Sequence, residues 1–265
     1  MNTSPLPFSR MALAGASTVA MLILTACGGG DEGDPGPAQA SSSECNSPVQ
    51  THFATKFQVS GARIGTMDTE YTYGEKADFN GQAVLQNTER RSFAYTGPSD
   101  LAGLSGNEII VDYFTVDDAN EVITAYGSAS ATVWASAPQR IRTEAFIYSP
   151  PMTSRMFQLM PGQSTDLIFS GTRRLEDWDG RVTTDSADHV DHVTYHGQET
   201  ITVPAGTFTA CKFTTTGNSA ASQATAYIQW IAKGTGAILK EQSTDEGDSA
   251  GSTTVINEAV EIRQF

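Results

Sequence analysis

Gly197-Gln198-Glu199-Thr200-Ile201-Thr202-Val203-Pro204-Ala205-Gly206-Thr207-Phe208 is the stretch of this chain that decides its fold. Polar and apolar residues alternate up to Val203, which is typical of a half-buried β-strand. Pro204 and Gly206 then take the second and fourth positions of a type I turn, and a glycine there suits a bulged hairpin loop. In this alternation, one face of the first strand carries Val193, Tyr195, Ile201 and Val203. The segment from His189 to Thr215 is therefore predicted to be a β-hairpin.

The rest of the chain also favours strands. Short runs of alternating or β-branched residues are separated by turn chemistry, as in Asp117-Asp118-Ala119-Asn120. No stretch after the N-terminal segment keeps a helical period for more than about two turns. Further strands are expected at 53–59, 107–116, 121–126, 140–148, 167–171, 226–232, 237–242 and 253–265. The predicted fold is all-β, with a strongly curved antiparallel sheet or an open barrel.

The N-terminus carries a targeting signal. A basic residue, Arg10, precedes the apolar run from Met11 to Leu24, and the run closes with Leu24-Thr25-Ala26-Cys27. This ending resembles the lipobox of bacterial lipoproteins, which implies that Cys27 carries acyl chains such as palmitate and begins the mature protein. The alternatives are an ordinary signal peptide with a chance cysteine or an uncleaved anchor. The apolar run is shorter than the roughly 20 residues of a good membrane span.

The order of segments fits a lipid-anchored domain. We expect a signal peptide at residues 1–26, an acylated cysteine with a Gly/Pro/Ser-rich tether at 27–44, and one β domain at 45–265. Gly28 follows the cysteine. In the lipoproteins that this signal resembles, an Asp at that position favours the inner membrane, so Gly28 implies the periplasmic face of the outer membrane.

The charge balance limits the partners. The whole chain has a net charge of −14, and loss of Arg10 with the signal gives −14 − 1 = −15. An acidic surface repels nucleic acid, so no nucleic-acid partner is expected, and contact with the membrane is assigned to the lipid on Cys27. No other cofactor is expected.

Cysteine usage predicts one disulfide. With Cys27 acylated, Cys45 and Cys211 remain in an oxidising compartment. The alternative is two separate thiols, with Cys211 a small buried apolar residue.

The hairpin motif also carries a resemblance. Residues 197–208, followed by Cys211-Lys212, resemble a signature of uncharacterised bacterial periplasmic proteins and lipoproteins with the sequence Val-Pro-Ala-Gly-Thr-Phe. The segments Trp230–Lys240 and Tyr148–Pro151 also fit, and the resemblance covers about 113–242. It implies a curved antiparallel sheet similar in outline to lipoprotein carriers, and it implies no known chemistry. The alternative is that the motif is only a well-built hairpin.

Candidate metal ligands are few. His189, His192 and His196 form the densest cluster, with His192 and His196 on one face of a strand and His189 on the other. The solvent-exposed beginning of a strand explains these histidines equally well, so we expect no metal. Met152, Met156 and Met160 suit cuprous copper or, more simply, core filling.

Catalytic motifs are scarce. The sequence has no phosphate-binding glycine loop of the type Gly-x-x-x-x-Gly-Lys-Ser/Thr and no His-Glu-x-x-His. We therefore expect a non-catalytic lipoprotein that binds an apolar ligand or an envelope protein, with Ile201, Val203 and Trp230 as candidate lining residues of an apolar cup. The alternatives are an envelope glycan hydrolase that uses Asp or Glu, and a purely structural envelope protein.

Overall fold

The computed structural model describes residues 40–46, 51–98, 101–119, 121–219, 225–245 and 253–265. Twelve strands and two single-turn 3-10 helices make up this part of the chain. In order they are η1 (Ser42–Cys45), β1 (His52–Gly61), β2 (Ile64–Phe79), β3 (Gln82–Gly97), β4 (Ser105–Asp117), β5 (Val122–Trp134), β6 (Ile141–Ser154), η2 (Met156–Gln158), β7 (Ser164–Glu176), β8 (Val182–Val203), β9 (Gly206–Ser219), β10 (Thr225–Ala232), β11 (Ile238–Asp245) and β12 (Thr253–Gln264). Within these residues, no helix is long and apolar enough to cross a membrane.

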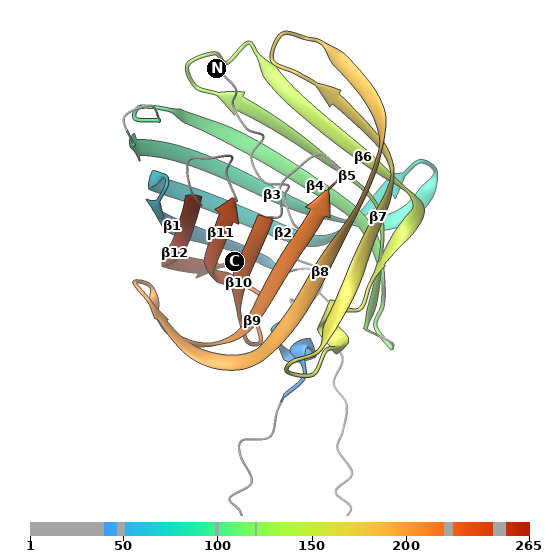
Figure 1. Cartoon of the computed structure of the whole chain (residues 1–265), viewed down its shortest axis with the longest axis vertical. Helices are drawn as coiled ribbons and strands as arrows, with labels where there is room; N and C mark the ends of the chain where they lie inside the picture. The colour runs from blue at the N-terminus through green and yellow to red at the C-terminus, as the bar shows by residue number, and fades with distance from the viewer. Residues whose placement is uncertain (1–39, 47–50, 99–100, 120, 220–224, 246–252) are drawn as a thin grey trace, which may run out of the picture.

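The strands form a closed antiparallel barrel (Figure 1). Each strand pairs with the next along the chain, and β12 returns to pair with β1 over Phe53–Gln264 to Gly61–Val255. The predicted all-β class is confirmed. The barrel is closed because its first and last strands satisfy each other's edge N–H and C=O groups, a long-range pairing that no local pattern reveals.

Most of the core lies on the inner face of this barrel, and the tip of the β8–β9 hairpin adds a smaller part on the outer face of β10–β12. In β1, Phe53 and Phe57 are fully buried, whereas Lys56 between them is exposed. Two apolar clusters result, one centred on β4–β9 with η2 and the other on β1, β2 and β9–β12. Met152 and Met156 belong to the first cluster, so they fill the core, and Met160 is exposed.

A β-bulge in β8 changes which hairpin side chains face inward. Tyr195 pairs with Phe213, but the next pair is Gly197 with Lys212, so the alternation shifts by one residue. Gly197 has a φ of 106°, a conformation that favours glycine. The prediction that Val193, Tyr195, Ile201 and Val203 share one face was wrong. The extra residue in the bulge shifts the alternation, so Ile201 and Val203 lie on the opposite side from Val193 and Tyr195.

The N-terminal part of the described chain is fastened to the bottom of the barrel in Figure 1, and we call residues 40–46 the strap. The backbone N–H of Ser42 donates to Leu159 at 2.9 Å, and its hydroxyl donates to the carbonyl of Met156 at 2.9 Å. The Tyr195 hydroxyl donates to the carbonyl of Ala40 at 3.2 Å. Residues 40–44, which the sequence places in the tether, therefore pack against the barrel.

Candidate functional site

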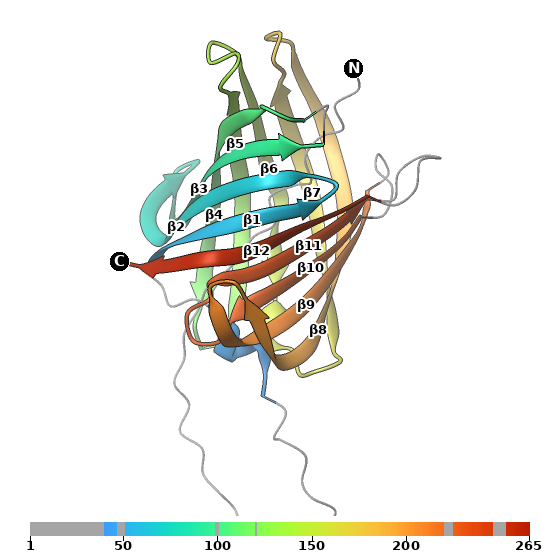
Figure 2. The same ribbon diagram turned by 90° about the vertical axis from the view of Figure 1, so that its left-hand side faces the viewer.

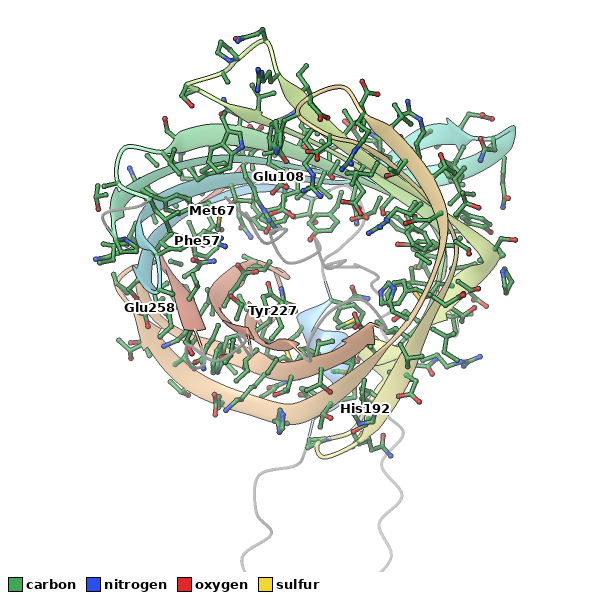
Figure 3. The ribbon with its side chains drawn as sticks, turned by 45° about the horizontal axis from the view of Figure 1, so that its top comes forward. Phe57, Met67, Glu108, His192, Tyr227 and Glu258 are labelled. Carbon is green, nitrogen blue, oxygen red and sulfur yellow. A yellow bond between two sulfur atoms is a disulfide. The ribbon has the colours of Figure 1, made fainter. Side chains whose placement is uncertain are left out.

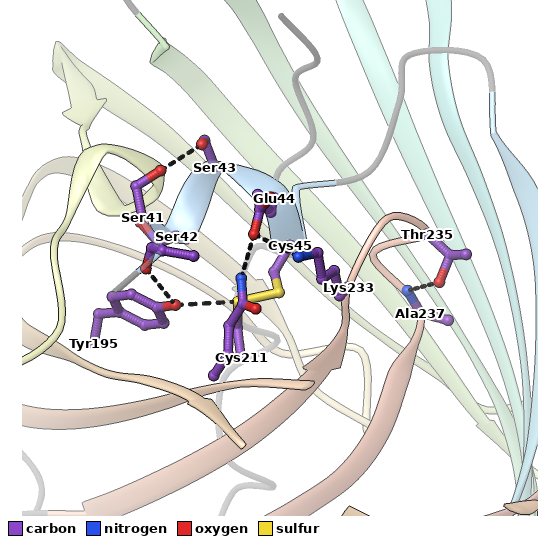
Figure 4. Close-up of a disulfide and its surroundings, with 12 residues drawn as sticks. Ser41, Ser42, Ser43, Glu44, Cys45, Tyr195, Cys211, Lys233, Thr235 and Ala237 are labelled. Carbon is purple, nitrogen blue, oxygen red and sulfur yellow. Dashed lines mark hydrogen bonds and ion pairs between the residues drawn. A yellow bond between two sulfur atoms is a disulfide. The ribbon is translucent and has the colours of Figure 1, made fainter. Parts of the chain in front are cut away.

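The predicted disulfide is present at the strap (Figure 4). Cys45 and Cys211 are bonded, with their Cα atoms 6.0 Å apart, and both side chains are fully buried. Beside them, Glu44 accepts hydrogen bonds from Gln198 and from Lys233, whose Nζ lies 2.8 Å away. The bond from Lys233 is the first cause of the lowered pKa of Glu44. The predicted lipid attachment site, Cys27, lies outside the described residues.

The three residues predicted to line an apolar cup pack together instead. Val203 and Trp230 are buried in the second cluster, and Ile201 packs against it. The indole Nε1 of Trp230 donates to Glu199 at 2.5 Å, on the outward face of the hairpin. The tip of this hairpin contacts β12, where the N–H of Ala205 donates to the carbonyl of Ala259 at 2.9 Å. These residues hold the hairpin in place, and they line no part of the pocket described next.

The histidine cluster is dispersed. His189 stacks on Phe169 with ring centroids 4.3 Å apart, His192 contacts Asp166 at 2.7 Å, and His196 contacts Thr214 at 2.8 Å. Among the residues that the structure describes, no three His, Cys, Asp or Glu side chains are grouped to hold a metal ion.

A groove of about 640 Å³ crosses the outer face of β12 and β1–β5, and we call it the outer groove. Figure 2 shows these six strands side by side. The outward side chains that line it are His52, Ala54, Asp68, Glu70, Arg90, Ser92, Asn107, Ile109, Ala131, Val133, Arg263 and Phe265. Four inward-facing residues also line it, and because strand side chains alternate, they contribute backbone to its floor: Thr55, Thr69, Arg91 and Glu108.

The outer groove has an aromatic end and a charged middle. His52 stacks on Phe265 with ring centroids 4.4 Å apart, and its Nε2 lies 2.8 Å from Glu70. Arg90 is exposed and makes no ion pair with any described residue. The small side chains Ala54 and Ala131 leave space between these polar groups. The arrangement can hold a molecule with both apolar and charged parts.

The inside of the barrel, here called the lumen, is polar along one wall. Figure 3 shows Glu108 and Tyr227 on the inside and His192 and Glu258 on the outside. Across β8 to β6, Asp185 pairs with Arg173 at 2.9 Å, and Arg173 lies 3.9 Å from Glu144. Glu144 in turn lies 3.6 Å from Arg142.

The same wall continues through β5, β4 and β3. Thr132 sits directly opposite Arg142 and donates to Glu108 at 3.3 Å. Arg91 lies 3.3 Å from Glu108 and also pairs with Glu89. Two groups of ion pairs and hydrogen bonds therefore line this wall, one near the hairpin of β7 and β8 and one on β3–β5, and Arg142 and Thr132 face each other between them.

Burial controls the protonation of this wall. Desolvation raises the pKa of Asp112 to about 7, the nearby Glu89 charge adds to the rise, and Arg91 opposes it. The pKa of Glu89 is also raised by burial, against the lowering effect of Arg91. Asp112 and Glu89 therefore hold their protons at higher pH than exposed carboxyl groups do.

Sequence reasoning missed both the outer groove and the luminal wall. Each draws one or two residues from many strands, so neither is visible until the strands are paired. The only local signal was Glu89-Arg90-Arg91, a charged run inside a strand, because charges are depleted from buried strand positions.

Part of the chain is similar to a known family. Residues 179–255 match the model of the DUF3108-like family, a match that begins before β8 and ends inside β12. No curated protein matches the chain.

Two solved structures are similar along most of the chain. One is described as an exported protein with a YmcC-like fold from Bacteroides fragilis NCTC 9343, with 13% identity, 82% of this chain and 98% of the other covered, and a TM-score of 0.41. The other is described as a lipoprotein from Parabacteroides distasonis ATCC 8503, with 12% identity, 81% and 97% covered, and a TM-score of 0.31.

Proposed function

We propose that this protein is a non-catalytic, lipid-anchored binding protein of the bacterial cell envelope, and that its outer groove takes an amphiphilic ligand or the matching part of an envelope partner. The outer groove is the observation that carries the proposal. Its volume of about 640 Å³ lies in the range of small-molecule sites, about 300–1,000 Å³. The lipobox at Cys27 supports the anchor.

The lining favours a ligand with two chemical parts. Ala54, Ile109, Ala131 and Val133 offer apolar surface, which gains about 25 cal/mol for each Å² removed from water. Arg90 offers a guanidinium group that pairs well with a carboxylate or phosphate. A fatty-acid-like molecule, with an apolar chain and an anionic head, satisfies both parts.

Binding of a short-chain fluorescent fatty-acid analogue tests this proposal. Wild-type protein is expected to bind it with saturation. Ala131→Trp fills the groove floor and is expected to weaken binding at least tenfold, and Arg90→Ala is expected to weaken it several-fold. Ala83→Trp, on an exposed part of β3 outside the groove, is the matched control. Absence of saturable binding, or equal binding by Ala131→Trp and wild type, would contradict the proposal.

A second candidate function rests on two carboxylates in the same groove. Asp68 and Glu70 are two residues apart on one face of β2, so both carboxyl groups face the outer groove. Glycoside hydrolases place two carboxyl groups about 5–9.5 Å apart. Incubation with envelope glycans separates the two functions, because a hydrolase would release sugars and lose that activity in Asp68→Asn. The binding proposal predicts no release by either protein.

A further inference from the structure

We propose that the lumen is a second binding site, independent of the outer groove, for a small linear molecule that carries several amino groups. Four observations lead to it: a graded opening, unpaired carboxylates, buried hydroxyls without partners, and carboxylates that face one another from separate strands.

The luminal wall is open at one end. Side-chain exposure is 47% at Asp185 and 30% at Arg173, 20–23% at Glu144 and Arg142, and 11–19% at Glu108, Arg91 and Glu89. Charged side chains inside a barrel need water or ionic partners, because burying an isolated charge is very costly. The gradient therefore describes a wet entrance near the β7–β8 hairpin that narrows toward the middle.

Carboxyl groups outnumber arginines along this path. The luminal acids are Glu89, Glu108, Asp112, Glu144, Asp185, Asp191 and Glu241, and the luminal cations are Arg91, Arg142 and Arg173. Glu241 is 6% exposed and receives hydrogen bonds from the neutral groups of Tyr227, Gln229 and Asn257. It makes no direct ion pair with any described residue, although Arg91 acts on it from a distance, so an incoming cation would meet a carboxylate without a contacting positive charge.

Two buried hydroxyl groups lie beside the charged wall. Thr69 sits directly opposite Arg91 in the strand register, and Thr55 sits directly opposite Thr69, so all three point into the lumen. The side-chain oxygens of both threonines are buried without a hydrogen-bond partner. Thr55 is 1% exposed and Thr69 is 2% exposed. A buried hydroxyl without a partner costs about 1–3 kcal/mol. A bound amine supplies N–H donors for these oxygens.

The carboxylates face one another from different strands. Glu241 on β11 acts electrostatically on Glu89 and Arg91 of β3, as well as on Tyr71 of β2. Arginine side chains separate the acids, and the described residues hold no group of three ligands for a metal ion. A chain of ammonium groups matches this spacing better than one compact ion does, because each ammonium can pair with a carboxylate at a different depth.

The protonation of the cluster gives an independent signature. Burial raises the pKa values of Asp112 and Glu89, and Glu241 adds to the rise at Glu89. The groups that act on Asp112 are Glu89 and Arg91, and Tyr148 faces it from β6. An ammonium group nearby favours the charged carboxylates, so binding is expected to release protons near pH 7.

Isothermal titration of the mature full-length lipoprotein in non-ionic detergent, with spermidine as the probe, tests this inference. We expect saturable binding, at least tenfold weaker in Glu241→Gln and unchanged in Glu75→Gln, which removes the same charge from an exposed site on β2. Buffers of different ionisation enthalpy should reveal proton release. Asp112→Asn, a second luminal variant, should bind spermidine more weakly and release fewer protons.

Three results would overturn the inference. They are no saturable binding by wild type, equal loss of binding in Glu241→Gln and Glu75→Gln, and complete displacement of spermidine by an equal concentration of Mg²⁺. The first leaves no site, the second indicates attraction to the acidic surface as a whole, and the third indicates a metal site. None depends on the outer groove, whose fatty-acid binding should be unchanged in Glu241→Gln.

Discussion

Among single residues, Asp112 has the clearest consequence for stability. It is 9% exposed on β4, in the lumen, and its pKa is raised to about 7 by burial, with Glu89 nearby. Unfolding returns the carboxyl to its ordinary value of 3.8. Between those two values the folded protein binds one proton more than the unfolded chain, so the free energy of unfolding falls as the pH rises.

Asp112→Asn should remove this loss. The asparagine does not ionise, so above pH 7 the variant should be more stable than wild type by as much as about 4 kcal/mol, and the difference should shrink toward pH 4. Urea unfolding at pH 4.5, 6 and 8 measures it. A stability difference that does not change with pH would show that the Asp112 carboxyl ionises normally in the folded protein.

The residues that sequence reasoning identified correctly are those constrained by chemistry alone. Cys45 and Cys211 were paired by counting cysteines in an oxidising compartment. His189, His192 and His196 were correctly placed on a strand. Their partners lie on the neighbouring strands β7 and β9, and the register between strands could not be derived from the sequence. Asp112 and Glu241 gave no signal, because their burial follows from barrel closure.

At the scale of elements, the β8–β9 hairpin shows how far a pattern reaches. Alternation and the Pro204–Gly206 turn predicted the hairpin and its turn, and Val203 does pair with Gly206. The bulge at Tyr195–Gly197 then moved Ile201 and Val203 to the outer face, where the tip packs near Trp230. A one-residue shift reverses every following side chain, so the element was predictable and its faces were not.

Neighbouring substitutions test this assignment. Val203 is 4% exposed and Thr202 is exposed. Val203→Asp buries an unpaired charge and should lower the free energy of unfolding by about 3 kcal/mol or more, whereas Thr202→Asp should change it by about 0.5 kcal/mol or less. Thermal unfolding of both variants measures the difference. Similar effects at the two positions would mean that the hairpin tip does not pack against the barrel.

For the whole molecule, two long-range links define the structure. The pairing of β1 with β12 closes the barrel, and the Cys45–Cys211 disulfide joins the strap to β9 across 166 residues. Of these two links, only the disulfide could be predicted from the sequence. Two cysteines can pair in one way, whereas twelve strands can pair in many ways.

Loss of the disulfide should be costly. A cross-link over such a long loop mainly limits the unfolded chain, and native disulfides typically contribute about 2–5 kcal/mol. Cys45→Ala with Cys211→Ala should therefore lower the free energy of unfolding by that amount, and reductant should have no further effect on the variant. Equal stability of variant and wild type under non-reducing conditions would show that the strap does not hold the barrel.

We propose that a lipid on Cys27 anchors a barrel whose outer groove carries an amphiphilic ligand. Native mass spectrometry of wild type and Ala131→Trp, both purified from their own envelope, tests the anchor and the ligand together. We expect a mature chain that begins at Cys27 with covalent acyl groups, together with a non-covalent ligand that wild type retains and Ala131→Trp loses. A chain without lipid at Cys27, or the same bound mass on both proteins, would contradict it.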